Sequence, residues 1–187
     1  MRPCQRPTSV DAKTIVDFWT LAGPERWFTR DAAFDGALSV RFGEALKRAR
    51  LGAYDHWVET PEGALGLIIL LDQVSRNIHR DSPLAFAGDA KALVLAKISV
   101  SRNYHQMLPA PLAQWLIMPF EHAEDMDAQQ RCVALFTTMA LTEMIHYAKI
   151  HLDIIARFGR FPHRNAFLGR TSTPAEIAFL QNGGFAG

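Results

Sequence analysis

A carboxylate and an imidazole adjoin in residues 119–125, where Glu121 directly precedes His122. This pair could transfer protons, because a neighbouring carboxylate fixes the tautomer of an imidazole and raises its basicity. His163 is a second histidine that could act as acid or base on the same substrate. The structural alternative is that the acids of this segment begin the next helix, where the helix dipole favours them. We predict His122, Glu121 and His163 as the catalytic candidates.

A second polar segment, residues 72–77, follows the apolar run ALGLIILL at residues 64–71. It places an acid, an amide, a guanidinium and a second amide at the end of a helix that is apolar on all sides. Such groups either satisfy the terminal carbonyls of the helix or bind a ligand at the edge of the core. Under the ligand interpretation, the binding candidates are Gln73, Arg76 and Asn77.

The third segment, residues 149–170, carries five Lys or Arg against one acid, Asp153. Arginine forks bind carboxylate or phosphate with two hydrogen bonds, which is typical of an anion site. The alternative is internal pairing with the four acids of residues 121–127, since the two blocks carry equal and opposite charge. The anion-binding candidates here are Arg157, Arg160, Arg164 and Asn165.

The common catalytic signatures are missing from the sequence: it holds no G-x-G-x-x-G, Walker loop, G-x-S-x-G or H-E-x-x-H. Glu143 and His146 have the spacing of one di-iron ligand pair, but that chemistry needs two such pairs, so an exposed helix face is the simpler interpretation. The side chains most competent to bind a metal match no known closed site, namely His122, Asp125, His151 and Asp153. We predict no metal and no cofactor.

Composition excludes several classes of protein. The 187 residues include 20 Lys plus Arg and 19 Asp plus Glu, for a net charge of +1, and 49% are hydrophobic. This balance argues against intrinsic disorder and against nucleic acid or an anionic membrane as a partner. The longest apolar run is far short of the roughly 20 residues of a membrane span. Two distant cysteines and an N-terminus without an apolar signal segment predict a cytoplasmic protein.

The sequence predicts that helices position these residues. Apolar residues recur at helical spacing, and no segment shows the strict alternation of apolar and polar residues that is typical of a strand. Helix starts are predicted at Thr8 or Ser9, near Asp31, at Thr60-Pro61, at Ser82-Pro83, at Asp125 or Asp127, at Thr142 and at the capping box of Thr173-Pro174-Ala175-Glu176. Three prolines confine another helix to about two turns at residues 112–118. We predict an all-α fold, with residues 1–187 as a single domain of about eight helices.

The polar segments in this order resemble the bacterial proteins grouped as domain of unknown function 924. The resemblance covers about residues 12–182, and residues 153–165 (DIIARFGRFPHRN) are its most specific part. It is carried by Asp17-Phe18-Trp19, Leu70-Leu71-Asp72-Gln73 with Arg76-Asn77, Ala85-Phe86-Ala87, residues 119–125, His151, residues 153–165, Gly169-Arg170 and Ser172-Thr173-Pro174. It departs at Val74-Ser75, where the family usually has Phe-Pro, and at Thr20-Leu21, where Phe-Gly usually follows. The resemblance implies stacked helical hairpins, tetratricopeptide-like without a sequence repeat, and no activity, because the family is uncharacterised.

Three functions remain open. The first is a binding module that holds an anionic small molecule or peptide through the Arg/His/Gln/Asn cluster, favoured because the polar residues form three blocks near helix ends. The second is a hydrolase or transferase on an anionic substrate, with His122 or His163 as acid–base and Glu121 orienting it. The third is a helical protein–protein interaction scaffold, which would form a homo-oligomer through an exposed apolar face.

Overall fold

The computed structural model describes residues 10–185, and within that range all regular structure is helical. The all-α prediction is therefore confirmed. The α-helices of eight or more residues are α1 (Ala12–Ala22), α3 (Ala32–Arg50), α4 (Pro61–Ile68), α6 (Asp89–Ser101), α8 (Ala110–Glu121), α9 (Met126–Thr138), α10 (Thr142–Phe158) and α11 (Pro174–Gln181). The short elements are α2 (Pro24–Trp27), α5 (Ser75–Ile78), α7 (Tyr104–Met107), the 3₁₀-helices η1 (Asp55–Glu59), η3 (Pro83–Phe86) and η4 (Pro162–Arg164), and the π-helix η2 (Ile69–Val74).

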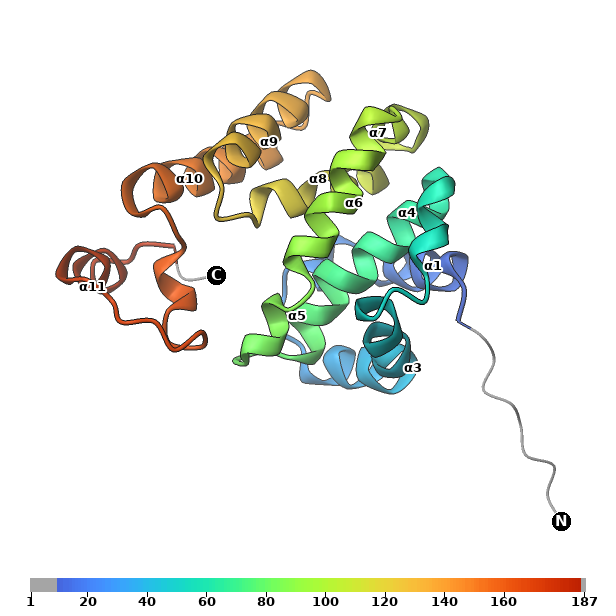
Figure 1. Cartoon of the computed structure of the whole chain (residues 1–187), viewed down its shortest axis with the longest axis horizontal. Helices are drawn as coiled ribbons and strands as arrows, with labels where there is room; N and C mark the ends of the chain where they lie inside the picture. The colour runs from blue at the N-terminus through green and yellow to red at the C-terminus, as the bar shows by residue number, and fades with distance from the viewer. Residues whose placement is uncertain (1–9, 186–187) are drawn as a thin grey trace, which may run out of the picture.

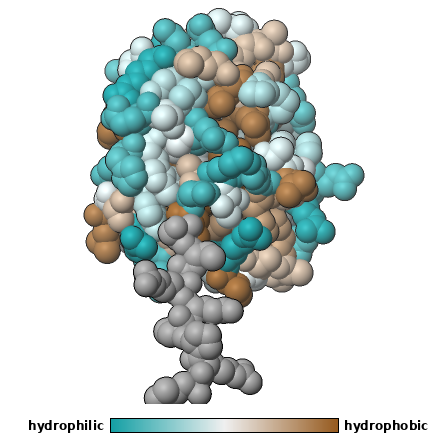
Figure 2. Space-filling view, turned by 90° about the vertical axis from the view of Figure 1, so that its right-hand side faces the viewer, coloured by the Kyte–Doolittle hydropathy of each residue, from teal (hydrophilic) through white to brown (hydrophobic). Residues whose placement is uncertain are grey.

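Helix α4 is central: α1, α6 and α8 all pack on it. Helix α9 packs against α8 and along α10, while α11 lies at the opposite end of the molecule from α1 (Figure 1). The tetratricopeptide-like arrangement and the single-domain boundary stay predictions. No helix within residues 10–185 is long and apolar enough to cross a membrane. On the face seen in Figure 2, apolar residues are interspersed among polar ones.

Two apolar clusters hold these helices together. The larger includes the ALGLIILL segment, where Leu65, Ile68 and Leu71 have no exposed surface, as expected for a helix that is apolar all round. The smaller lies beneath the C-terminal segment and is built on Ile154 and Phe161. Burying one such side chain contributes about 2 kcal/mol relative to leaving it in water.

Four of the predicted helix starts are confirmed by side-chain caps. The residues whose side chains accept from the first-turn backbone are Asp31, Thr60, Asp125 and Thr173, the last within a complete capping box. Three other starts differ. Asp11 caps α1, whereas Thr8 and Ser9 lie outside the described residues; Ser82 caps only the 3₁₀-helix η3; and Thr142 is the first residue of α10, not its cap.

The expectation of two turns for residues 112–118 was wrong, because α8 runs for 12 residues and contains Pro119. A proline removes one backbone donor, but residues 113–121 are all buried, and tertiary packing holds the helix together across that lost bond. The bond from His122 N to Met118 O, 3.0 Å, extends the helix past the proline. Helix α8 therefore delivers Glu121 and His122 into the interior.

The helix that begins at Pro61 also continues further than the apolar run indicates. Helices α4, η2 and α5 follow one another without a break to Ile78, and the middle six residues form a π-helix. Single π-turns inserted in α-helices are rare and occur often at functional sites. Asp72 and Gln73 thus lie inside a buried helix instead of at its end.

Gly88 brings the start of α6 against this π-helix. A Cβ added at Gly88 would lie 2.3 Å from the carbonyl oxygen of Leu71, which no side chain tolerates. The close approach carries Asp89, the first residue of α6, to Arg76. A glycine here is therefore a condition for the charge network that supports the site.

Candidate active site

A cavity of about 480 Å³ opens between the π-helix with α5, the end of α8, and α10. On each helix, the residues that line the cavity recur three or four positions apart. Residues at this spacing are neighbours on one face of a helix, so each helix turns a single face to the cavity. The lining residues are Trp27, Phe28, Gln73, Arg76, Asn77, Arg80, Met118, Glu121, His122, Glu143, Met144, Tyr147, His151 and Phe185.

His122, on the cavity wall, is paired with the buried Asp72 behind it. His122 Nδ1 lies 2.8 Å from Asp72 Oδ1 and 3.0 Å from Oδ2. Asp72 is fully buried, and although burial alone would raise its pKa, Arg76 and His122 hold that pKa below its usual range. Because an ionised carboxylate only accepts, Nδ1 carries the proton and Nε2 presents a lone pair. Burial and the charge of Arg76 outweigh Asp72 and lower the pKa of His122, so the ring is neutral at pH 7.

A chain of paired charges supports Asp72 from behind. Arg76 donates to Asp72 Oδ1 at 2.9 Å and binds Asp89 with both terminal nitrogens, at 2.8 and 3.0 Å. Arg164 donates to Asp89 at 3.3 Å, and both guanidiniums lie over the ring of Phe86. The network joins η2, α5, α6 and η4, so the position of Asp72 depends on all four elements.

Glu121 and His151 form the second titratable pair on the wall. Glu121 Oε1 lies 3.4 Å from His151 Nδ1, and its Oε2 lies 4.0 Å from the thiol of Cys132. Burial and the nearby Asp72 raise the pKa of Glu121 to about 8, so the carboxyl is protonated at neutral pH. Burial also lowers the pKa of His151 to about 4, and its Nδ1 donates to the carbonyl of Tyr147 at 2.9 Å.

Aromatic rings also line the cavity. Trp27 is fixed by a hydrogen bond from Nε1 to the carbonyl of Trp19, 2.7 Å, while Phe28 is 61% exposed. From the other side, Phe185 contacts the ring of His151, with ring centroids 4.6 Å apart. The site therefore combines aromatic and methionine side chains with a larger set of polar and charged groups, some of them buried.

Sequence-predicted candidates divide into two groups. Those on the cavity wall are Gln73, Arg76, Asn77, Glu121 and His122. Those that do not line it are Arg157, Arg160, His163, Arg164 and Asn165. Glu121 faces His151, and the carboxylate that orients His122 is Asp72.

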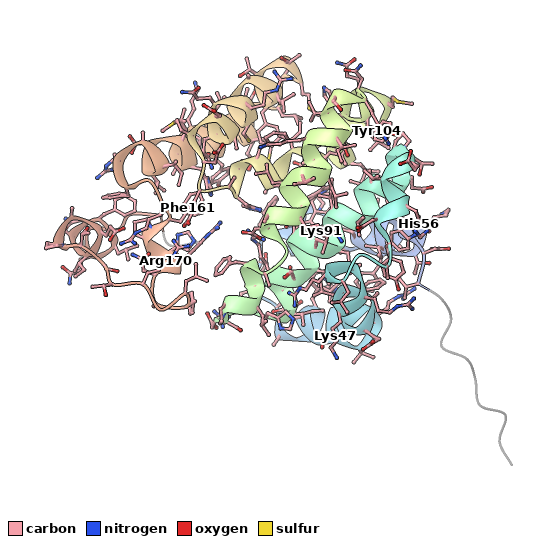
Figure 3. All side chains as sticks on the ribbon, viewed as in Figure 1. Lys47, His56, Lys91, Tyr104, Phe161 and Arg170 are labelled. Atoms are coloured by element: carbon pink, nitrogen blue, oxygen red, sulfur yellow. The ribbon has the colours of Figure 1, made fainter. Side chains whose placement is uncertain are left out.

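The second group makes internal contacts. Arg160 binds both oxygens of Glu176, at 2.6 and 2.9 Å, and Arg157 pairs with Asp153 at 3.3 Å. The expected pairing between the acidic and basic blocks amounts to Glu124 with Arg170, 2.8 Å apart. Arg170 and Phe161 both belong to the segment between α10 and α11 (Figure 3), and the backbone of Phe161 also donates to Glu124.

The chain is similar to one known protein family and to a protein of known structure. The family model described as "Bacterial protein of unknown function (DUF924)" matches residues 15–184. The chain belongs to this family. A protein of unknown function from Agrobacterium tumefaciens has a similar structure, with a TM-score of 0.88 and 42% identity over 91% of this chain and 97% of its own. No curated protein matches.

Some residues at the cavity of this DUF924 chain escaped sequence reasoning. Asp72, which lies behind the wall, was in a segment singled out for its polarity but was not among the candidates, and His151 was considered as a metal ligand and as part of the family resemblance but not as a catalytic or ligand-binding residue. A usable signal existed, because Glu143, Tyr147 and His151 recur every four residues along α10. Among residues 10–185, no three His, Cys, Asp or Glu side chains are grouped to hold a metal ion.

Proposed function

We propose that this protein is an enzyme that performs general acid–base chemistry on a small molecule, with hydrolysis as the reaction class. One observation carries the proposal: His122 is held by the buried carboxylate of Asp72 on the wall of a cavity that also contains Glu121. A histidine oriented through Nδ1 by a carboxylate presents Nε2 as a base, and this arrangement recurs in many hydrolases.

His122 and Glu121 have opposite protonation states at neutral pH, which suit them to act as base and acid respectively. His122 is neutral and can take a proton from water, while Glu121 is protonated and can give one. In the reaction, a water oxygen attacks the electrophilic centre as its proton passes to His122 Nε2. The bond to the leaving group breaks as Glu121 protonates that group. Transfer of the proton from His122 to Glu121 through solvent restores the starting state.

Cavity-facing amides would hold the substrate in place. Gln73 Nε2 donates to Asp72 at 2.6 Å and Asn77 Nδ2 donates to Asp35 at 2.8 Å, so both amides are fixed in orientation. Rigid polar groups at the reacting centre reduce the entropy cost of orienting the substrate. The aromatic lining would bind its apolar part and exclude water.

A screen of chromogenic ester and amide substrates tests the proposal, with His122→Gln as the variant. His146→Gln is the matched control, because His146 is an exposed histidine that does not line the cavity. General-base catalysis contributes about 10²- to 10⁴-fold, so kcat/KM should fall by that amount in His122→Gln and stay unchanged in the control. Turnover that survives in purified His122→Gln would refute the role of His122.

A ligand-binding protein without turnover is the second candidate, favoured by the aromatic rings of Trp27, Phe28, Tyr147 and Phe185 on the wall. It predicts that His122→Gln changes ligand affinity but that no substrate is consumed. The enzyme proposal instead requires a pH profile of kcat/KM with two limbs. The acid limb belongs to His122, whose pKa lies below its ordinary value of 6.5, and the alkaline limb lies near pH 8, where Glu121 ionises.

A further inference from the structure

Several polar side chains on the cavity wall keep an uncommitted hydrogen-bond acceptor. The amides of Gln73 and Asn77 use their nitrogens on the carboxylates of Asp72 and Asp35, so each retains a carbonyl oxygen for a ligand. Their orientations are fixed by chemistry, because a carboxylate partner accepts only from the N–H side of an amide.

Both wall histidines present acceptors for the same reason. His122 donates through Nδ1 to Asp72, and His151 donates through Nδ1 to the backbone carbonyl of Tyr147. A neutral imidazole that donates from one nitrogen has a lone pair on the other. In each ring, Nε2 is therefore an acceptor.

Positive charge on the wall is already compensated. Arg76 is paired with Asp72 and Asp89, and Arg80 binds both oxygens of Asp35. Among the described residues Glu143 makes no ion pair, and it is an exposed carboxylate at the cavity. An incoming anion would meet this carboxylate and four acceptor atoms, and would have to compete with the carboxylates of Asp72, Asp89 and Asp35 for the arginines.

We infer that the cavity takes an organic amine, with the ammonium group directed to the acceptors and Glu143 and with the apolar body against the aromatic rings. Rings such as Trp27, Phe28 and Tyr147 also attract a cation through their faces. The inference rests on the proposed function in one respect, that the substrate of the enzyme occupies this cavity. It replaces the anionic substrate expected from the sequence with a cationic one.

Three probes with one phenyl body test the charge preference by isothermal titration: 2-phenylethylamine, 2-phenylethanol and 3-phenylpropionate. The amine should bind most tightly and the carboxylate about ten-fold or more weakly, a difference that corresponds to about 1.4 kcal/mol. The methyl NMR signals of Met118 and Met144, which line the cavity, should shift with the amine. Equal or tighter binding of the carboxylate, or an amine that leaves both methyl signals unmoved, overturns the inference.

Glu143→Gln provides the residue-level test, and Glu44→Gln is its control, since Glu44 is an exposed helical acid outside the cavity. Loss of one exposed charge should weaken the amine by about two- to five-fold and leave the alcohol unchanged. If Glu143→Gln and the control bind the amine with equal affinity, Glu143 does not interact with the ammonium group.

Binding and catalysis can fail separately in these experiments. Amine binding with a flat activity screen would refute the enzyme proposal and keep the inference about ligand class. If the protein hydrolyses carboxylate substrates in a reaction that depends on His122 and does not bind the amine, the inference about ligand class is refuted and the enzyme proposal is kept.

Discussion

His122 Nδ1 and Asp72 Oδ1 lie 2.8 Å apart, although 50 residues separate them in the chain. The contact joins the end of α8 to the middle of a π-helix, so it forms only when the core between these elements is packed. The Asp–His pair is thus a product of the tertiary fold.

Asp72→Asn should retain the shape of the side chain and lose its charge. His122 would then lack its carboxylate and Arg76 would keep Asp89 as a partner, and breaking a buried pair in this way costs about 3–5 kcal/mol. Activity that depends on His122 should fall by at least about 10²-fold. Urea unfolding and kcat/KM measure the two effects. Asp17→Asn is the control, because it alters only an exposed pair with Lys13 and should change stability by less than about 1 kcal/mol. A folded Asp72→Asn protein with full activity would contradict the assigned role.

Glu121→Gln should change how stability depends on pH. The pKa of Glu121 is about 8 in the folded protein against an ordinary value of 4.5, so its contribution is fully present below pH 4.5 and is lost as pH rises towards 8. The variant does not ionise, and relative to it the wild type should lose on the order of 3 kcal/mol between pH 5 and pH 8. Urea unfolding at four pH values measures this. Parallel stability curves for the two proteins would mean that Glu121 ionises normally.

Cys132 should be unreactive in the native protein. It is buried, and burial together with the nearby Glu121 raises the pKa of its thiol, so thiolate is scarce. Iodoacetamide at pH 8 should leave Cys132 unmodified in the folded state and modify it fully in guanidinium chloride, as read by peptide mass spectrometry. Rapid native modification would indicate that α9 opens locally.

Gly88→Ala should destabilise the protein by about 1–3 kcal/mol, because the new methyl group would clash with the carbonyl of Leu71. Gly36→Ala is the matched control. Gly36 lies inside α3 with no atom within 4 Å of an added Cβ, so alanine there should stabilise by about 0.5–1 kcal/mol. Urea midpoints distinguish the two, and shifts of the same sign would contradict the packing described at Gly88.

The local features of the fold were predictable from sequence, and the long-range ones were not. Caps such as Asp31 and Thr173 depend on a few adjacent residues, so their patterns predicted helix starts correctly. The continuation of α8 through Pro119 depends on burial by other helices, which a local proline rule does not include.

The candidate site was partly predictable for the same reason. Gln73, Glu121 and His122 stood out because polar groups interrupted apolar sequence, and all three line the cavity. The partner of His122 was misassigned, because the sequence neighbour Glu121 points to His151 while the distant Asp72 supplies the contact. Polar residues within apolar sequence could be predicted to lie near the core. Which of them contact each other depends on how the helices cross, which the sequence does not show.

The π-helix at residues 69–74 also makes the length of this segment matter to the candidate site. A π-turn holds about one residue more than an α-turn, so removing one residue there would restore a regular α-helix. About five residues of a π-turn advance through nearly the same angle as four residues of an α-helix, so the residues beyond the deletion would keep their faces. Arg76, Asn77 and Arg80 would therefore stay at the cavity, and the deletion would change the positions of Asp72 and Gln73, which lie inside the π-helix. The extra residue of this segment thus contributes to the candidate site by placing Asp72 and Gln73.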